Sequence, residues 1–248
     1  MWAVALIIDL GVPFVAWRHA ERIPPDASHL PERFGLFTII LLGESIVAVM
    51  HGMESQEYWS YSAALAALVG MGIAFCFWWW YFDGAKAAAE RPIRSRRDRL
   101  LFHIWSYAHL PLYLGIAVVA VGIKHIVSLA GGAALQSSEA WILCTATALT
   151  MLALAVIGAT SESSQRDCRL TLALLLQCSV AGITLLAGTL GDQVPPVFLV
   201  SGLALLCLLQ VVLAARHQDI AQDECKPGEK FPEFEEAETP RLKVVTTT

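Results

Sequence analysis

The sequence predicts an all-α, polytopic transmembrane helical bundle. Hydrophobic residues make up 56% of the 248 positions and only 16% are charged, whereas about a quarter of a water-soluble domain is charged. The apolar residues are gathered into blocks long enough to cross a hydrocarbon core of roughly 30 Å at ~1.5 Å per helical residue. Inside lipid each segment must satisfy its own backbone hydrogen bonds, so the blocks are expected to be helices.

About seven spans are expected along the chain, at residues 2–17, 34–51, 59–82, 100–123, 140–159, 170–190 and 194–215. The first span is short for a bilayer and has no basic leader or cleavage site before it, so it is not a signal peptide. Its abrupt start leads us to expect a further segment on the N-terminal side. Residues 1–215 form the expected transmembrane domain, and the acidic, proline-containing residues 216–248 form an expected disordered tail.

The cations orient these spans. Sixteen of the seventeen Lys and Arg residues fall in loops 18–33, 83–99 and 160–169 or in the tail, and Lys124 alone falls on the other side. Because cytoplasmic loops are enriched in Lys and Arg, we expect a multi-pass protein of the bacterial cytoplasmic (inner) membrane with its tail in the cytoplasm. The basic run Arg91–Arg99 is expected to meet anionic lipid headgroups and not nucleic acid.

Two features of the third span point to packing and not to chemistry. Its aromatic run 75–82 is expected to be an interfacial belt. Small residues recur every four positions and favour a close helix contact: Ser62, Ala66, Gly70 and Ala74.

Three ionisable residues lie in apolar spans: Asp9, Glu44 and His109. Each lies about 12–15 Å from the cytoplasmic surface at ~1.5 Å per residue, so we expect a buried polar cluster inside the bundle. Two interpretations stay open. The cluster forms a proton or ion path, or its members pair as interhelical glue worth only about 1 kcal/mol per contact.

A second polar layer is expected at the cytoplasmic mouth of the bundle. An ion-pair latch is the ordinary interpretation of this layer, and a gate or anion site is the sharper one. Its members flank the second, third and fourth spans: His29, Glu32, Arg33, Asp83, His103 and Tyr107.

No catalytic, cofactor or metal motif is present in the sequence. There is no Ser-His-Asp order, phosphate loop or His-Glu-x-x-His pattern. The six cysteines lie far apart, without Cys-x-x-Cys spacing, and are expected to be packing residues. No two histidines are obvious opposing haem ligands. We therefore expect no catalytic residues, no cofactor and no metal.

The segment "HLPERFGLFTIILLGESIV" resembles the signature of the bacterial low-temperature-requirement A (LtrA) family of membrane proteins. "WWWYFD" and "YAHLPLYLGIAVVAVGIKHIV" resemble later blocks of the family, in the expected order. The resemblance covers about residues 1–215 and corresponds to a C-terminal portion, because family members usually begin with additional spans. It implies a polytopic inner-membrane protein named for a cold-growth phenotype, and it assigns no residue a role.

Two functional hypotheses follow from these observations. The first is a proton- or ion-coupled transporter or channel-like protein built around the buried cluster. The second is a non-transporting scaffold or membrane-enzyme subunit in stress adaptation, in which the cluster is glue. The bilayer and a small ion are the expected partners, and an oligomer is compatible with both hypotheses.

Overall fold

The computed structural model describes residues 29–56, 60–85, 95–129, 135–161, 168–191 and 193–224, together with the isolated residues Val4 and Gly11. These ranges contain helices and no strand, as the sequence predicts. In chain order the helices are α2 (Leu30–Glu54), α3 (Tyr61–Ala85), α4 (Arg96–Leu129), α5 (Ser137–Ser161), α6 (Cys168–Gly188) and α7 (Pro196–Glu224).

Five of these helices are long and apolar enough to cross a membrane: Leu30–Glu54, Tyr61–Asp83, Arg96–Leu129, Ser137–Thr160 and Pro196–Arg216. A shorter apolar helix, Ala173–Gly188, coincides with the sixth expected span. The multi-pass helical membrane class predicted from the sequence is therefore confirmed. The first expected span, 2–17, lies outside the described residues apart from Val4 and Gly11.

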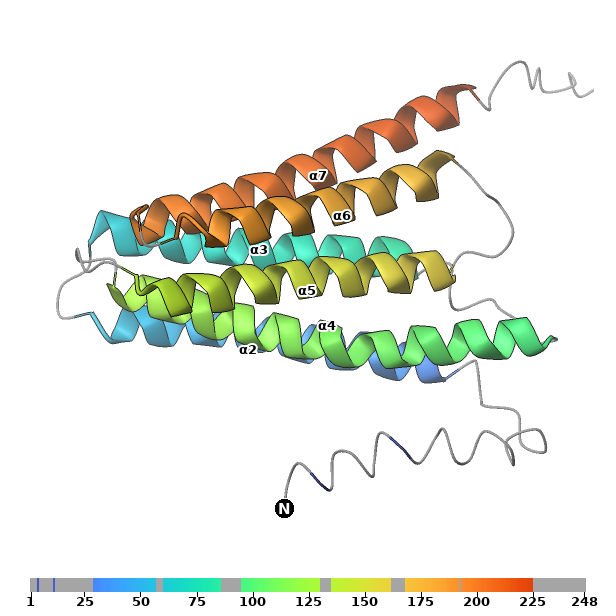
Figure 1. The fold of residues 1–248 in the computed structure, drawn as a ribbon, viewed down its shortest axis with the longest axis horizontal. Helices are drawn as coiled ribbons and strands as arrows, with labels where there is room; N and C mark the ends of the chain where they lie inside the picture. The colour runs from blue at the N-terminus through green and yellow to red at the C-terminus, as the bar shows by residue number, and fades with distance from the viewer. Residues whose placement is uncertain are drawn as a thin grey trace, which may run out of the picture.

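The helices lie side by side, and each runs in the direction opposite to the helix before it in the chain, so the bundle is elongated along the helix axes (Figure 1). Helix α4 packs against α2, α3 and α5, while α3 also packs against α7, and α6 bridges α5 and α7. One end of the bundle holds the starts of α2, α4 and α6 and the ends of α3, α5 and α7. We call this end the basic side, because the Lys- and Arg-rich loops adjoin it, and the other end the opposite side.

Two helices extend further than the apolar blocks predict. Helix α4 has 34 residues, about 51 Å at ~1.5 Å per residue, which exceeds a hydrocarbon core of roughly 30 Å. Helix α7 continues to Glu224 although its apolar span ends at Arg216. Residues 217–224 contain no Pro or Gly, so the helix has no local reason to stop where the apolar residues stop.

Glycines let α4 approach its neighbours closely. A Cβ added at Gly52 of α2 would lie 2.8 Å from the carbonyl oxygen of Lys124, and one added at Gly70 of α3 would clash with the side chain of Ile123. A Cβ added at Gly115 would lie 3.1 Å from the carbonyl oxygen of Ala146 on α5. Small residues at helix crossings are the usual means of close packing in membranes. The packing face predicted around Gly70 is confirmed, since Ala66 and Gly70 are buried.

Polar side chains fix the helix ends. At the start of α4, Ser95 and Asp98 exchange hydrogen bonds as a capping box, with distances of 2.9 and 3.1 Å. On the opposite side, the Gln56 amide donates to the carbonyls of Val127 at 2.9 Å and Ser128 at 2.7 Å. Gln56 thereby satisfies carbonyls that the end of α4 would otherwise leave unpaired.

Candidate functional site: a buried histidine node

His109 lies on α4 with no exposed surface. Its Nδ1 is 2.8 Å from the carbonyl oxygen of Trp105, one turn earlier. A carbonyl only accepts hydrogen bonds, so Nδ1 carries the proton. Nε2 lies 3.2 Å from the hydroxyl of Tyr81 on α3, and in the neutral ring it accepts the proton of that hydroxyl. Both ring nitrogens are therefore paired, one within α4 and one across to α3.

Helix α2 completes this group. Thr38, which is also fully buried, donates to the carbonyl of Phe34 at 2.8 Å, and the Tyr113 hydroxyl donates to the same carbonyl at 3.0 Å. The Thr38 hydroxyl also interacts with the hydroxyls of Tyr81 and Tyr113. We call the group of Thr38, Tyr81, His109 and Tyr113 the histidine node. It joins α2, α3 and α4 through side-chain hydroxyls, an imidazole and backbone carbonyls.

Aromatic rings enclose the imidazole of His109. The ring centroids of Phe34 and Trp105 lie 4.3 and 4.5 Å away, and that of Tyr113 lies 5.7 Å away. The Tyr81 ring meets the imidazole edge-on, with a centroid distance of 5.7 Å. The node is thus a small polar group inside an apolar wall, where hydrogen bonds are stronger than in water and an unpaired polar atom is costly.

Two of the three expected members of the polar cluster, Glu44 and His109, fall within the described residues, and only His109 is buried. Asp9 lies outside the described residues. Glu44 is exposed on α2, because the buried face of this helix runs through Thr38, Ser45 and Val49. One position along a helix with 3.6 residues per turn is a rotation of about 100°. Glu44 therefore points about 100° away from Ser45, and its angle to the centre of the buried face is larger still.

The aromatic run 75–82 serves two purposes. Phe75 and Trp78 are exposed, as an interfacial belt requires. Phe77, Trp80 and Tyr81 are buried in the bundle, because a helix carrying aromatic residues at consecutive positions presents them on all sides. Tyr81, the partner of His109, was therefore missed as a site residue.

Several buried polar side-chain atoms have no hydrogen-bond partner in the protein. Among the described residues these atoms are the indole nitrogens of Trp79, Trp80 and Trp105, the hydroxyl of Ser106 and both amide atoms of Gln210. The first four residues lie within about ten positions of the basic end of their helix, and Gln210 lies six positions before Arg216, where the apolar span of α7 ends. Trp105 also contacts the ring of His109. We call the five residues with unpaired atoms the unpaired layer.

The residues expected at the mouth lie on the basic side, at the starts of α2 and α4 and the end of α3. His29 and Glu32 are exposed, with their side chains 4.0 Å apart at the start of α2. Arg33 is exposed beside them, and Asp83 is half-buried at the end of α3.

The other two mouth residues belong to a different feature. His103 and Tyr107 are half-buried on α4 and line a hollow of about 460 Å³ between α4 and α5. The other lining residues are apolar and come from both helices, among them Leu100 and Pro111 of α4 and Ala153 and Val156 of α5.

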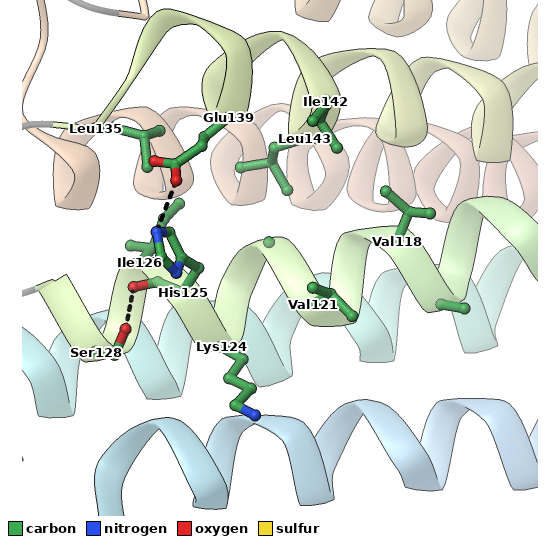
Figure 2. A pocket seen from close by; sticks show the side chains of 12 residues that line it. Val118, Val121, Lys124, His125, Ile126, Ser128, Leu135, Glu139, Ile142 and Leu143 are labelled. Atoms are coloured by element: carbon green, nitrogen blue, oxygen red, sulfur yellow. Dashed lines mark hydrogen bonds and ion pairs between the residues drawn. The ribbon is translucent and has the colours of Figure 1, made fainter. Parts of the chain in front are cut away.

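A second hollow, of about 520 Å³, lies between α4 and α5 near the opposite side (Figure 2). His125 Nε2 and Glu139 Oε1 meet across it at 2.8 Å, while Lys124 points away from this pair toward α2. This pair was not predicted from the sequence. His125 and Glu139 lie at the two ends of one loop between expected spans, and this position could have indicated that both reach the same membrane surface.

No metal or disulfide site is formed within the described ranges. They contain no group of three or more His, Cys, Asp or Glu side chains that could hold a metal ion. Cys76, Cys144, Cys178 and Cys207 are free thiols there.

A bundle of apolar helices around a hydrogen-bonded histidine defines a multi-pass membrane protein with a polar core. The profile of the bacterial low temperature requirement A protein (LtrA) family matches residues 1–215, and the chain belongs to this family. The family expected from the sequence motifs is thereby confirmed.

One similar protein is described as uncharacterized and comes from Rhizobium meliloti (strain 1021). It is 32% identical to this chain over 136 residues, which cover 49% of this chain and 32% of the relative. The match thus spans about a third of that relative's length. No solved structure gives a significant match.

Proposed function

We propose that this LtrA-family chain is a proton- or ion-coupled transporter or channel-like protein of the bacterial inner membrane. The observation that carries the proposal is the unpaired layer beside the histidine node. Buried Trp and amide groups usually find hydrogen-bond partners, so five such residues without one call for water or a solute. A purely structural apolar bundle has no need of them.

In this proposal water enters from the basic side through the unpaired layer and reaches the histidine node. Trp105 links the two, because its indole nitrogen belongs to the layer and its carbonyl accepts from His109. His109 then binds or releases a proton at Nε2, and Tyr81 is the hydroxyl that exchanges with it. Ionisable groups within a span are expensive and mark ion or proton pathways by default.

Glu44 and Asp9 enter the proposal as further titratable groups along α2 and the first expected span. Glu44 is exposed at membrane depth on the face of α2 that no described helix covers. A carboxylate in contact with hydrocarbon costs several kcal/mol (about 2.5–3.5 on insertion scales). Water or another protein segment therefore covers it in the proposed state.

The segregation of cations supports the orientation of the proposal. With the Lys- and Arg-rich loops in the cytoplasm, the entry is cytoplasmic and the acidic tail lies on the same side. Residues 1–215 act as the membrane domain, and the mouth residues His29, Glu32, Arg33 and Asp83 line the cytoplasmic surface.

One observation favours the second candidate function, a non-transporting scaffold or membrane-enzyme subunit linked to low-temperature growth. Both nitrogens of His109 are already satisfied, as they would be in interhelical glue. In this function His109 contributes to stability and transfers no proton.

Flux measurements separate the two functions. Purified protein is reconstituted into vesicles of phosphatidylethanolamine and phosphatidylglycerol containing a pH-sensitive dye, and proton, Na⁺, K⁺ and Cl⁻ fluxes are measured. His109→Gln keeps hydrogen bonding but does not titrate, so proton flux should fall at least tenfold while the protein stays folded. His51→Gln, the same change at an exposed site on α2, is the matched control and should leave flux unchanged. Absence of any flux in the wild type, with a stability loss alone in His109→Gln, would establish the scaffold.

A further inference from the structure

The hollow between α4 and α5 on the basic side is lined along α4 by a row of residues on one face of the helix. His103, Tyr107 and Pro111 line it at four-residue spacing, so they share one face of the helix. Leu100 starts the row three residues before His103. The apolar wall opposite comes from Leu149 to Val156 of α5.

The length of this hollow matches one leaflet of a bilayer. From Leu100 to Pro111 the helix rises about 16 Å at ~1.5 Å per residue, and half of a hydrocarbon core is roughly 15 Å. Its apolar lining faces the depth at which acyl chains lie. Of its two polar lining residues, His103 lies toward the basic end and Tyr107 lies deeper, one turn before Pro111.

The helix face continues beyond the hollow into basic residues. Arg96 precedes Leu100 by four positions and Arg99 precedes His103 by four, so each arginine lies one helical turn before a residue that lines the hollow, on its basic side. Arg96 is exposed and Arg99 is half-buried. The apolar groove has the length of one leaflet and complements an acyl chain. The two guanidinium groups at its end complement a phosphate, so together they match an anionic phospholipid.

We propose that the α4–α5 groove on the basic side binds one anionic phospholipid, with an acyl chain in the hollow and the phosphate at Arg96 and Arg99. The charge of the groove end selects a phosphate-bearing lipid, since guanidinium groups bind phosphate in a bidentate manner.

The hollow has a volume of about 460 Å³ and an almost wholly apolar lining, which suits a flexible hydrocarbon chain. The site is independent of the transport proposal, because it lies on the α4–α5 surface and includes no residue of the histidine node.

Native mass spectrometry of the delipidated full chain tests the site, with dioleoyl phosphatidylglycerol and dioleoyl phosphatidylcholine as probes. One phosphatidylglycerol should bind in preference to phosphatidylcholine. Arg96→Gln with Arg99→Gln should weaken this binding about thirtyfold, because each arginine near a headgroup contributes roughly 1 kcal/mol. The double change to Lys keeps the charge and should retain most of the preference.

A second variant tests the hollow itself. Ala153→Phe places a ring in the groove and should abolish the bound lipid, while Ala64→Phe adds the same ring at an exposed alanine of α3 and should not. The proposal is overturned if the two lipids bind equally to the wild type. It is also overturned if the Arg-to-Gln variant, verified as folded by circular dichroism, retains phosphatidylglycerol as the wild type does.

Discussion

Replacement of Gly115 by Ala tests the closeness of α4 and α5. The added methyl group would clash with the Thr150 hydroxyl and lie 3.1 Å from the carbonyl oxygen of Ala146 and 3.2 Å from the amide nitrogen of Thr150. The Thr150 hydroxyl cannot turn away without loss, because it is fully buried and donates to Ala146 at 2.9 Å. The two backbone atoms belong to α5, so the whole helix would have to move.

The magnitude follows from two opposed effects. Ala is favoured over Gly within a helix by ~1 kcal/mol, and overpacking a tight contact costs ~1–3 kcal/mol. Gly158→Ala on α5 gives the first effect alone, because nothing lies within 4 Å of its added methyl group. The two variants should therefore differ in free energy of unfolding by ~1–3 kcal/mol, with Gly158→Ala the more stable.

Unfolding by sodium dodecyl sulfate from mixed micelles, followed by circular dichroism, measures this difference. Both variants make the same chemical change, so their intrinsic helix propensities cancel. If Gly115→Ala proved as stable as Gly158→Ala, α4 and α5 would not be packed as closely as the structure has them.

Three further outcomes are expected. Tyr81→Phe should destabilise the protein by ~1 kcal/mol through loss of the hydroxyl bonded to His109. The same change made in a His109→Phe background should cost clearly less. If the costs of the two changes were additive, the two side chains would not be coupled. Glu44→Gln should preserve yield and thermal stability but reduce proton flux, and wild-type flux would remove Glu44 from the path. In Ser95→Cys, the new thiol should react with membrane-impermeant thiol reagents only from the cytoplasm, and in Ser137→Cys only from outside. Labelling of position 95 in intact cells would show that the orientation is the reverse.

The helices of this chain are predictable because membrane spans are set by length and composition. The expected span 59–82 and helix α3 (Tyr61–Ala85) differ by only a few residues at each end, since a hydrocarbon core demands an apolar block of nearly fixed size. The close contact at Gly70 is predictable for a similar reason, because small residues at four-residue spacing have few other uses within a span.

Which way a side chain faces is much harder to predict. In a soluble helix the polar face reveals the buried one, but lipid tails are as apolar as Leu, so lipid-facing and buried faces look alike. Ile40 of α2 is 65% exposed and Leu42 is 7% exposed, yet the two are chemically similar.

Glu44 and His109 were expected at similar heights, but Phe34 of α2 contacts His109. Glu44 follows Phe34 by ten residues and so lies about 15 Å farther along α2 at ~1.5 Å per residue. The composition of the spans also carries no information about direction around each helix. For the same reason Tyr81 could not be distinguished from its neighbours in the aromatic run.

The ties at the opposite side have a mechanical consequence. Gln56 holds the end of α4 to the segment after α2, and His125 and Glu139 hold it to the start of α5. The ends of three helices are therefore tied together. The histidine node ties α4 to α2 and α3 a second time, at His109 and Tyr113. Of the 34 residues of α4, those between Arg96 and the node therefore have the greatest range of motion. Amide exchange should accordingly be slow between Tyr113 and His125 and fastest near Arg96.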